Sequence, residues 1–184
     1  MVTMYIGGGL ANKMFQYAFS LAIKKKGYDV VYDTITFKTE FVHDRVELDD
    51  IFPNVNMNKI SKSDYWAAGK QSKLARLVKR ISPKYITEHA YLFNDKAWEQ
   101  IKPTCYLESS WQDENYFVSA ADEVRQAFVF PPFEDERNVE VAQAMASSNS
   151  VAIHIRKGDG YGTWNIFSNT CPKKYYDKAL GYIK

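Results

Sequence analysis

The sequence opens with MVTMYIGGGLANKMFQYAFSLAIKKKG, residues 1–27, and this stretch decides the fold. Residues 1–6 are apolar and partly β-branched, which predicts a buried strand. After the glycines, apolar residues recur at helical spacing and predict a helix packed against a sheet: Leu10, Met14, Phe15, Ala18, Phe19, Leu21, Ala22 and Ile23. Residues 24–26 are lysines and Gly27 follows, both typical of a helix C-terminus. Residues 30–32 predict a second strand, so the chain begins with a right-handed βαβ unit.

The same patterns continue along the chain. They predict strands at residues 105–107 and 150–155, and helices at residues 114–128 and 135–146. A last helix follows Pro172, with an apolar face of Tyr175, Tyr176, Ala179, Leu180 and Ile183. Because strands alternate with helices, we expect an α/β fold: a Rossmann-like, mostly parallel sheet with flanking helices.

Composition limits the functional classes. The chain has 184 residues, 46% apolar and 25% charged, which suits one folded domain or one domain and part of another. A net charge of +2 is too small for a typical nucleic-acid binder. Cys105 and Cys171 are far apart and no HExxH occurs, so we expect neither a disulfide framework nor a metal site.

Location is predicted from what the sequence lacks. It has no apolar run near 18 residues and no signal-peptide pattern, so we expect a cytoplasmic protein. Basic residues recur every third position in residues 70–79, which predicts an amphipathic helix with a solvated basic face. The alternative for that face is peripheral contact with the anionic inner surface of a membrane.

Two loops carry the chemistry. In residues 7–13 (GGGLANK), a glycine-rich turn between strand and helix exposes N–H groups that bind phosphate or another anion. The alternative is a tight turn that only lets the helix pack on the strand. A dinucleotide fingerprint would need glycine or alanine where Asn12 stands.

The second loop, residues 154–159 (HIRKGD), follows a predicted strand, where parallel sheets bind their ligands. His154 and Arg156 share one face of the strand end. Arg156 offers a fork of donors for phosphate, and Lys157 adds a point charge. Asp159 can orient that charge or accept a proton. The alternative is a structural ion pair of Arg156 or Lys157 with Asp159.

Three stretches resemble one family. Residues 8–18 (GGLANKMFQYA) resemble the GGLGNQMFQYA opening of glycosyltransferase family 11, the α-1,2-fucosyltransferases. Residues 106–117 resemble that family's GYFQSxKYF stretch, and residues 151–160 resemble its HxRRGDY motif. The three stretches occur in the family's order and extend across the chain.

The resemblance implies a GT-B-like fold, in which two Rossmann-like halves face a cleft. It implies inverting transfer of L-fucose from GDP-fucose to the 2-hydroxyl of a galactose-containing oligosaccharide or glycolipid, without metal or other cofactor. Arg156 matches the arginine that contacts the donor β-phosphate, and Asn12 matches a donor-site asparagine. Gly9 and Lys157 complete the expected donor-binding residues. The catalytic candidates are Arg156, Asp159 and His154, the last two as rival bases.

The chain departs from the family pattern at Ala11, Lys13, Lys157 and Gly160, which replace glycine, glutamine, arginine and tyrosine. Family members also continue beyond this point. We therefore expect an acceptor-side domain at residues 1–148 and the incomplete start of the GDP-fucose domain at residues 149–184. Such a chain would be a partial form with little activity, and its exposed apolar surface would favour self-association.

Two other functional classes remain open at this stage. One is a Rossmann-like dinucleotide-binding oxidoreductase domain, with Asp29 or Asp33 binding the ribose. The other is a non-catalytic glycan-binding fragment.

Overall fold

The computed structural model describes residues 1–35, 46–60, 85–88, 92–155 and 171–183. The chain separates into two compact units, Met1–Pro132 and Phe133–Lys184. The domain boundary expected after residue 148 stays a prediction. Within the described ranges, no helix combines the length and apolar character needed to cross a membrane. The basic helix predicted at residues 70–79 lies outside the described residues.

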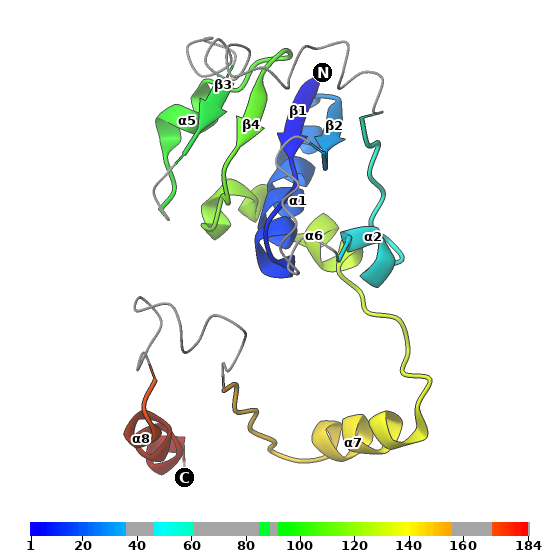
Figure 1. The fold of residues 1–184 in the computed structure, drawn as a ribbon, viewed down its shortest axis with the longest axis vertical. Helices are drawn as coiled ribbons and strands as arrows, with labels where there is room; N and C mark the ends of the chain where they lie inside the picture. The colour runs from blue at the N-terminus through cyan, green and yellow to red at the C-terminus, as the bar shows by residue number, and fades with distance from the viewer. Residues whose placement is uncertain (36–45, 61–84, 89–91, 156–170, 184) are drawn as a thin grey trace. The chain divides into compact units, whose positions relative to one another are not determined.

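A parallel four-stranded sheet organises the first unit (Figure 1). Its strands are β1 (Val2–Tyr5), β2 (Val30–Asp33), β3 (Tyr85–Thr87) and β4 (Tyr106–Glu108), in the order β2-β1-β4-β3. Helix α1 (Leu10–Lys25) connects β1 to β2. The predicted α/β class, the opening strand–helix–strand unit and a strand near residues 105–107 are therefore confirmed.

The core lies between one face of this sheet and α1. Alternate strand residues point to that face and are buried: Val2, Met4, Val30, Tyr32, Ile86 and Leu107. On the α1 side, Phe19 is fully buried, and its ring centroid lies 5.3, 4.8 and 4.9 Å from those of Trp98, Trp111 and Tyr116. These aromatic contacts join α1 to the chain on either side of β4, because Trp98 precedes that strand and the other two follow it.

Short elements complete the first unit. They are α2 (Leu48–Ile51), α5 (Asp95–Glu99), η2 (Glu114–Tyr116), η3 (Val118–Ala120) and α6 (Ala121–Ala127). The single helix predicted at residues 114–128 is wrong in its first half. There the Asp113 carboxylate accepts the N–H of Asn115 at 2.9 Å, and Phe117, with φ −136° and ψ 9°, leaves helical geometry. Only the last part continues as an α-helix.

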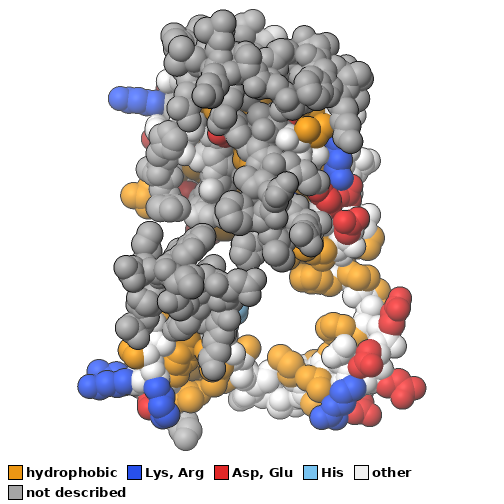
Figure 2. Space-filling model, in the orientation of Figure 1, with side chains coloured by type: hydrophobic (Ala, Val, Ile, Leu, Met, Phe, Trp, Pro, Cys, Tyr) orange, Lys and Arg blue, Asp and Glu red, His pale blue; other side chains and the backbone are white. Residues whose placement is uncertain are grey.

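The second unit contains α7 (Glu136–Ala146) and α8 (Lys173–Ile183), which confirms the helix predicted at residues 135–146 and the one after Pro172. The described residues of this unit include none that is buried, and Figure 2 shows hydrophobic side chains at its surface. The strand predicted at residues 150–155 is wrong: residues 151–155 have no regular structure. A strand needs a neighbour for its backbone hydrogen bonds, and no described residue pairs with this segment.

Buried Tyr32 makes the fold sensitive to alkali. Its hydroxyl lies 2.8 Å from the Ser20 Oγ, and burial raises the pKa of Tyr32 to about 12. Because the folded protein keeps this phenol neutral above the ordinary value near 10, its contribution to stability is complete below pH 10. We expect the free energy of unfolding to fall by about 2 kcal/mol between pH 10 and 12.

Urea titrations across this pH range measure that loss. Tyr32→Phe should reduce the slope of unfolding free energy against pH, because phenylalanine cannot ionise. A Tyr32→Phe variant with the wild-type slope would show that other groups cause the alkaline loss.

Candidate functional site

The turn between β1 and α1 has the geometry of a strand-to-helix ligand loop. Gly8 adopts φ +82°, in the left-handed region that favours glycine. A Cβ at Gly8 would lie 3.0 Å from the Asn12 Nδ2. Gly9 caps α1 with φ −65° and ψ 163°, and a Cβ there would meet no described atom within 4 Å. With respect to the described residues, the first turn of α1 thus begins beside open space, as an anion-binding turn requires.

A buried glutamine ties this turn to the chain leaving β4. The Gln16 Oε1 accepts the N–H of Gly7 at 2.9 Å, and its Nε2 donates to the carbonyl of Ser109 at 3.0 Å. Gln16 is only 2% exposed, so both backbone groups depend on a side chain rather than on water. The Gln16 clamp, meaning this side chain with its two bonds, holds the carboxyl ends of β1 and β4 in fixed positions.

A second bond joins the same two segments. The Gln112 Nε2 donates to the Asn12 Oδ1 at 2.5 Å. We call the turn and the segment facing it the carboxyl-edge site, which comprises Gly8, Gly9, Asn12, Ser109 and Gln112. It lies beyond the carboxyl ends of adjacent strands, where ligands bind in parallel sheets.

Trp111 gives the carboxyl-edge site its shape. It has φ +52°, a left-handed conformation that costs a bulky residue about 1–3 kcal/mol. The side chain is 2% exposed, and its ring lies 4.8 Å from that of Phe19 and 5.2 Å from that of Tyr116. Burial of this indole in the aromatic core offsets the backbone cost. The bend anchors the segment that carries Gln112.

The acids expected of a dinucleotide-binding domain are not presented to a ribose. Asp33 ends β2 but is fully buried: its Oδ1 accepts the N–H of Ile35 at 3.0 Å, and its Oδ2 accepts the hydroxyl of Tyr106 at 2.8 Å. Asp29 precedes β2, at the opposite edge of the sheet. This geometry argues against the oxidoreductase alternative.

Lys13, which stands where the family has glutamine, does not present its charge at the glycine turn. The side chain is 2% exposed, and its Nζ donates to the carbonyl of Val46 at 2.7 Å. The Lys13 ammonium group therefore forms a structural contact with the Val46 carbonyl.

The second predicted loop is described only at its start. His154 is exposed, and its carbonyl accepts the hydroxyl of Tyr176 at 3.2 Å. Arg156, Lys157 and Asp159 lie outside the described residues. The structure brings Gly9 and Asn12 together in the first unit, while His154 belongs to the second. Their predicted roles stay predictions.

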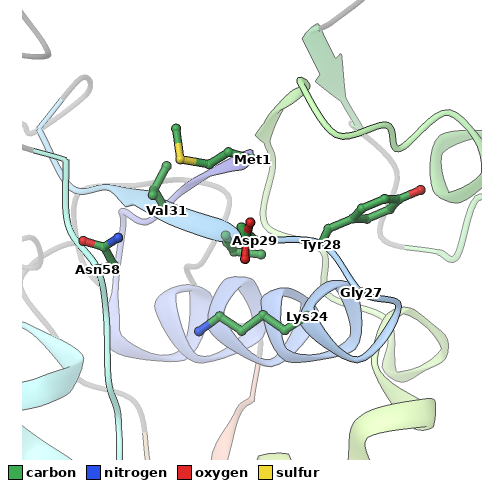
Figure 3. A pocket seen from close by; sticks show the side chains of 8 residues that line it. Met1, Lys24, Gly27, Tyr28, Asp29, Val31 and Asn58 are labelled. Atoms are coloured by element: carbon green, nitrogen blue, oxygen red, sulfur yellow. The ribbon is translucent and has the colours of Figure 1, made fainter.

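A hollow of about 540 Å³ lies at the amino ends of β1 and β2 (Figure 3). Its lining includes Met1, Lys24, Tyr28, Asp29 and Asn58. The Lys24 Nζ lies 5.0 Å from the centre of the Tyr32 ring, a cation–π contact within the fold. Because this is the wrong edge of a parallel sheet for ligands, we do not assign the site here. Among the described residues, no group of three His, Cys, Asp or Glu side chains could hold a metal ion.

The chain is similar to the α-1,2-colitosyltransferase of Escherichia coli. The two are 26% identical over 203 residues, covering 100% of this chain and 64% of the relative. The chain thus spans less than two thirds of the length of the relative it matches. No family model matches the chain, and no solved structure matches it.

Proposed function

We propose that the chain is part of a glycosyltransferase of two-domain, GT-B-like architecture. In this proposal it moves L-fucose from GDP-fucose to the 2-hydroxyl of a galactoside. The observation that carries the proposal is the similarity, over the whole of this chain and 64% of the relative, to an enzyme whose name states an α-1,2 glycosyl transfer. The glycine turn at the carboxyl edge of a parallel sheet supports it, because such turns bind the phosphates of nucleotide ligands.

The proposed reaction is an inverting displacement. The acceptor 2-hydroxyl oxygen attacks the anomeric carbon, and the bond from that carbon to the donor β-phosphate oxygen breaks. GDP leaves with the bonding electrons, and the hydroxyl proton passes to a base, for which His154 and Asp159 are the candidates. Arg156 stabilises the negative charge that grows on the departing GDP. No step requires a metal ion.

The described residues supply one wall of the proposed donor site. Gly9 leaves room for a substrate group to approach the backbone, and the first turn of α1 offers N–H groups at the positive end of the helix dipole. Asn12 adds a carboxamide beside the turn. These groups suit a diphosphate or a sugar hydroxyl.

A second donor sugar is favoured by the relative. Colitose is L-fucose without the hydroxyl at carbon 3, so the proposed linkage and leaving group are the same for both sugars.

The product of the complete reading frame should be assayed with the GDP-activated forms of both sugars and with lactose. We expect GDP release that depends on lactose, and an α-1,2 linkage in the NMR spectrum of the product. Lactose binding without turnover would favour a glycan-binding module, and NAD binding would favour an oxidoreductase domain.

The open space at Gly9 makes a direct prediction about donor binding. Gly9→Ala should leave the free energy of unfolding within about 0.5 kcal/mol of wild type, because φ −65° suits alanine and its Cβ meets no described atom. The affinity for GDP, measured by isothermal titration, should fall at least tenfold because the methyl group occupies the space left for the ligand.

The neighbouring glycine provides the comparison for stability. Gly8→Ala should lower the stability by about 1–2 kcal/mol, because φ +82° strains alanine. If Gly9→Ala binds GDP as wild type does, the donor does not approach this turn.

A further inference from the structure

We infer that Gln112 is a positioning residue, which fixes the carboxamide of Asn12 so that its N–H donors face the glycine turn. The inference deepens the proposed function, on which its turnover test rests. Its structural test does not depend on any activity.

The orientation of Asn12 follows from its two neighbours. A carboxamide has one accepting end and one donating end. The Gln112 Nε2 donates to the Oδ1 of Asn12 at 2.5 Å, so the accepting end points to the chain after β4. The Nδ2 then lies at Gly8, 3.0 Å from where a Cβ would be. The donors of Asn12 and the open space at Gly9 therefore occur in the same turn.

Without Gln112, little in the described contacts selects this orientation. The last torsion of an asparagine side chain is broad and roughly two-fold, so the amide can turn over and present its oxygen to the turn. An oxygen there would repel the oxygens of a diphosphate, whereas the NH₂ group binds them. The bond from Gln112 thus converts a rotating amide into a fixed donor.

Gln112 is itself held in place from the preceding residues. The Gln16 clamp binds the carbonyl of Ser109, and the buried Trp111 ring anchors the backbone directly before Gln112. A glutamine on an anchored segment loses less freedom when it forms a bond than one on a mobile loop. The segment after β4 therefore fixes the position of the Gln112 amide beside Asn12.

The first test is kinetic and uses the product of the complete reading frame with GDP-fucose and lactose. Gln112→Met keeps the side-chain length but loses the donor, and we expect KM for the donor to rise about tenfold with kcat changed less than twofold. Gln112→Glu should be at least as poor, because its carboxylate faces the Asn12 oxygen. The double variant Asn12→Ala with Gln112→Met should have the same KM for the donor as Asn12→Ala alone. Gln100→Met, at the exposed C-cap that follows α5, is the control and should match wild type.

Additive losses in the double variant would overturn the inference, because they would show that Gln112 does not act through Asn12. A wild-type KM in Gln112→Met would overturn it as well.

The second test needs no turnover and so separates this inference from the proposed function. In the ¹⁵N NMR spectrum of the chain, Gln112→Met should shift the side-chain NH₂ resonances of Asn12, while those of Asn58 stay in place. Unchanged Asn12 resonances would refute the inference even in an active enzyme. Shifted resonances in a protein that turns over neither donor would support the positioning role and refute the proposed reaction.

Discussion

Replacing Arg156 with alanine in the product of the complete reading frame is expected to lower kcat by 100- to 1000-fold. That loss corresponds to about 3–4 kcal/mol, the usual effect of removing one fixed group that stabilises charge in a transition state. The reason is the proposed leaving group: negative charge grows on the GDP β-phosphate as the glycosidic bond breaks. A guanidinium presents two parallel donors to such a phosphate.

Two variants separate this role from general charge. Arg156→Lys keeps the charge but loses the fork of donors, so it should recover only a small part of the rate. Lys157→Ala removes a neighbouring charge and should cost less than Arg156→Ala. Initial rates of GDP release at saturating donor and lactose measure all three. Wild-type turnover in Arg156→Ala would exclude it as the phosphate ligand and remove the main catalytic assignment of the HxR-type motif.

The opening strand, helix and second strand could be predicted because their signals are local and agree with one another. The apolar strand ends at glycines, the apolar stripe has helical spacing, and lysines follow at its end. The same reasoning failed at residues 151–155, whose alternating apolar residues resemble a strand. Val151, Ile153 and Ile155 are about half exposed, because pairing depends on a partner that local sequence does not specify. The short elements β3 and α5 were missed because they span too few residues to show a period.

The candidate site was predictable only in part, for a similar reason. Glycines before a helix identified the turn, and the resemblance selected Asn12. Gln112 was not found, because its bond to Asn12 joins residues 100 positions apart. Trp111 was missed because a positive φ is uncommon for tryptophan, and no sequence pattern predicts it. Gln16 did give a signal: it is a polar residue within a broad apolar stripe, which suggests a buried amide with specific partners.

Gln16 therefore carries the largest stability prediction. Gln16→Leu should lower the free energy of unfolding by about 3 kcal/mol, because it leaves the Gly7 N–H and the Ser109 carbonyl without their partner. Each such group costs about 1–3 kcal/mol when it is kept from water. Leucine has a similar size and a high helix propensity, so neither a cavity nor the helix itself explains a loss of this size.

Urea denaturation of the 184-residue chain measures the effect, with Gln143→Leu as the matched control. Gln143 is exposed on α7, and its replacement should change stability by less than about 0.5 kcal/mol. Gln16→Glu should keep one of the two hydrogen bonds of Gln16, because its carboxylate can still accept from the Gly7 N–H but cannot donate to the Ser109 carbonyl. It also buries a charge, so its loss should shrink as the pH is lowered and the carboxyl group becomes protonated. A Gln16→Leu variant as stable as wild type would mean that water or other groups satisfy Gly7 and Ser109. The two strand ends would then not be fixed by Gln16, and the rigid placement of Asn12 and Gln112 would need another cause.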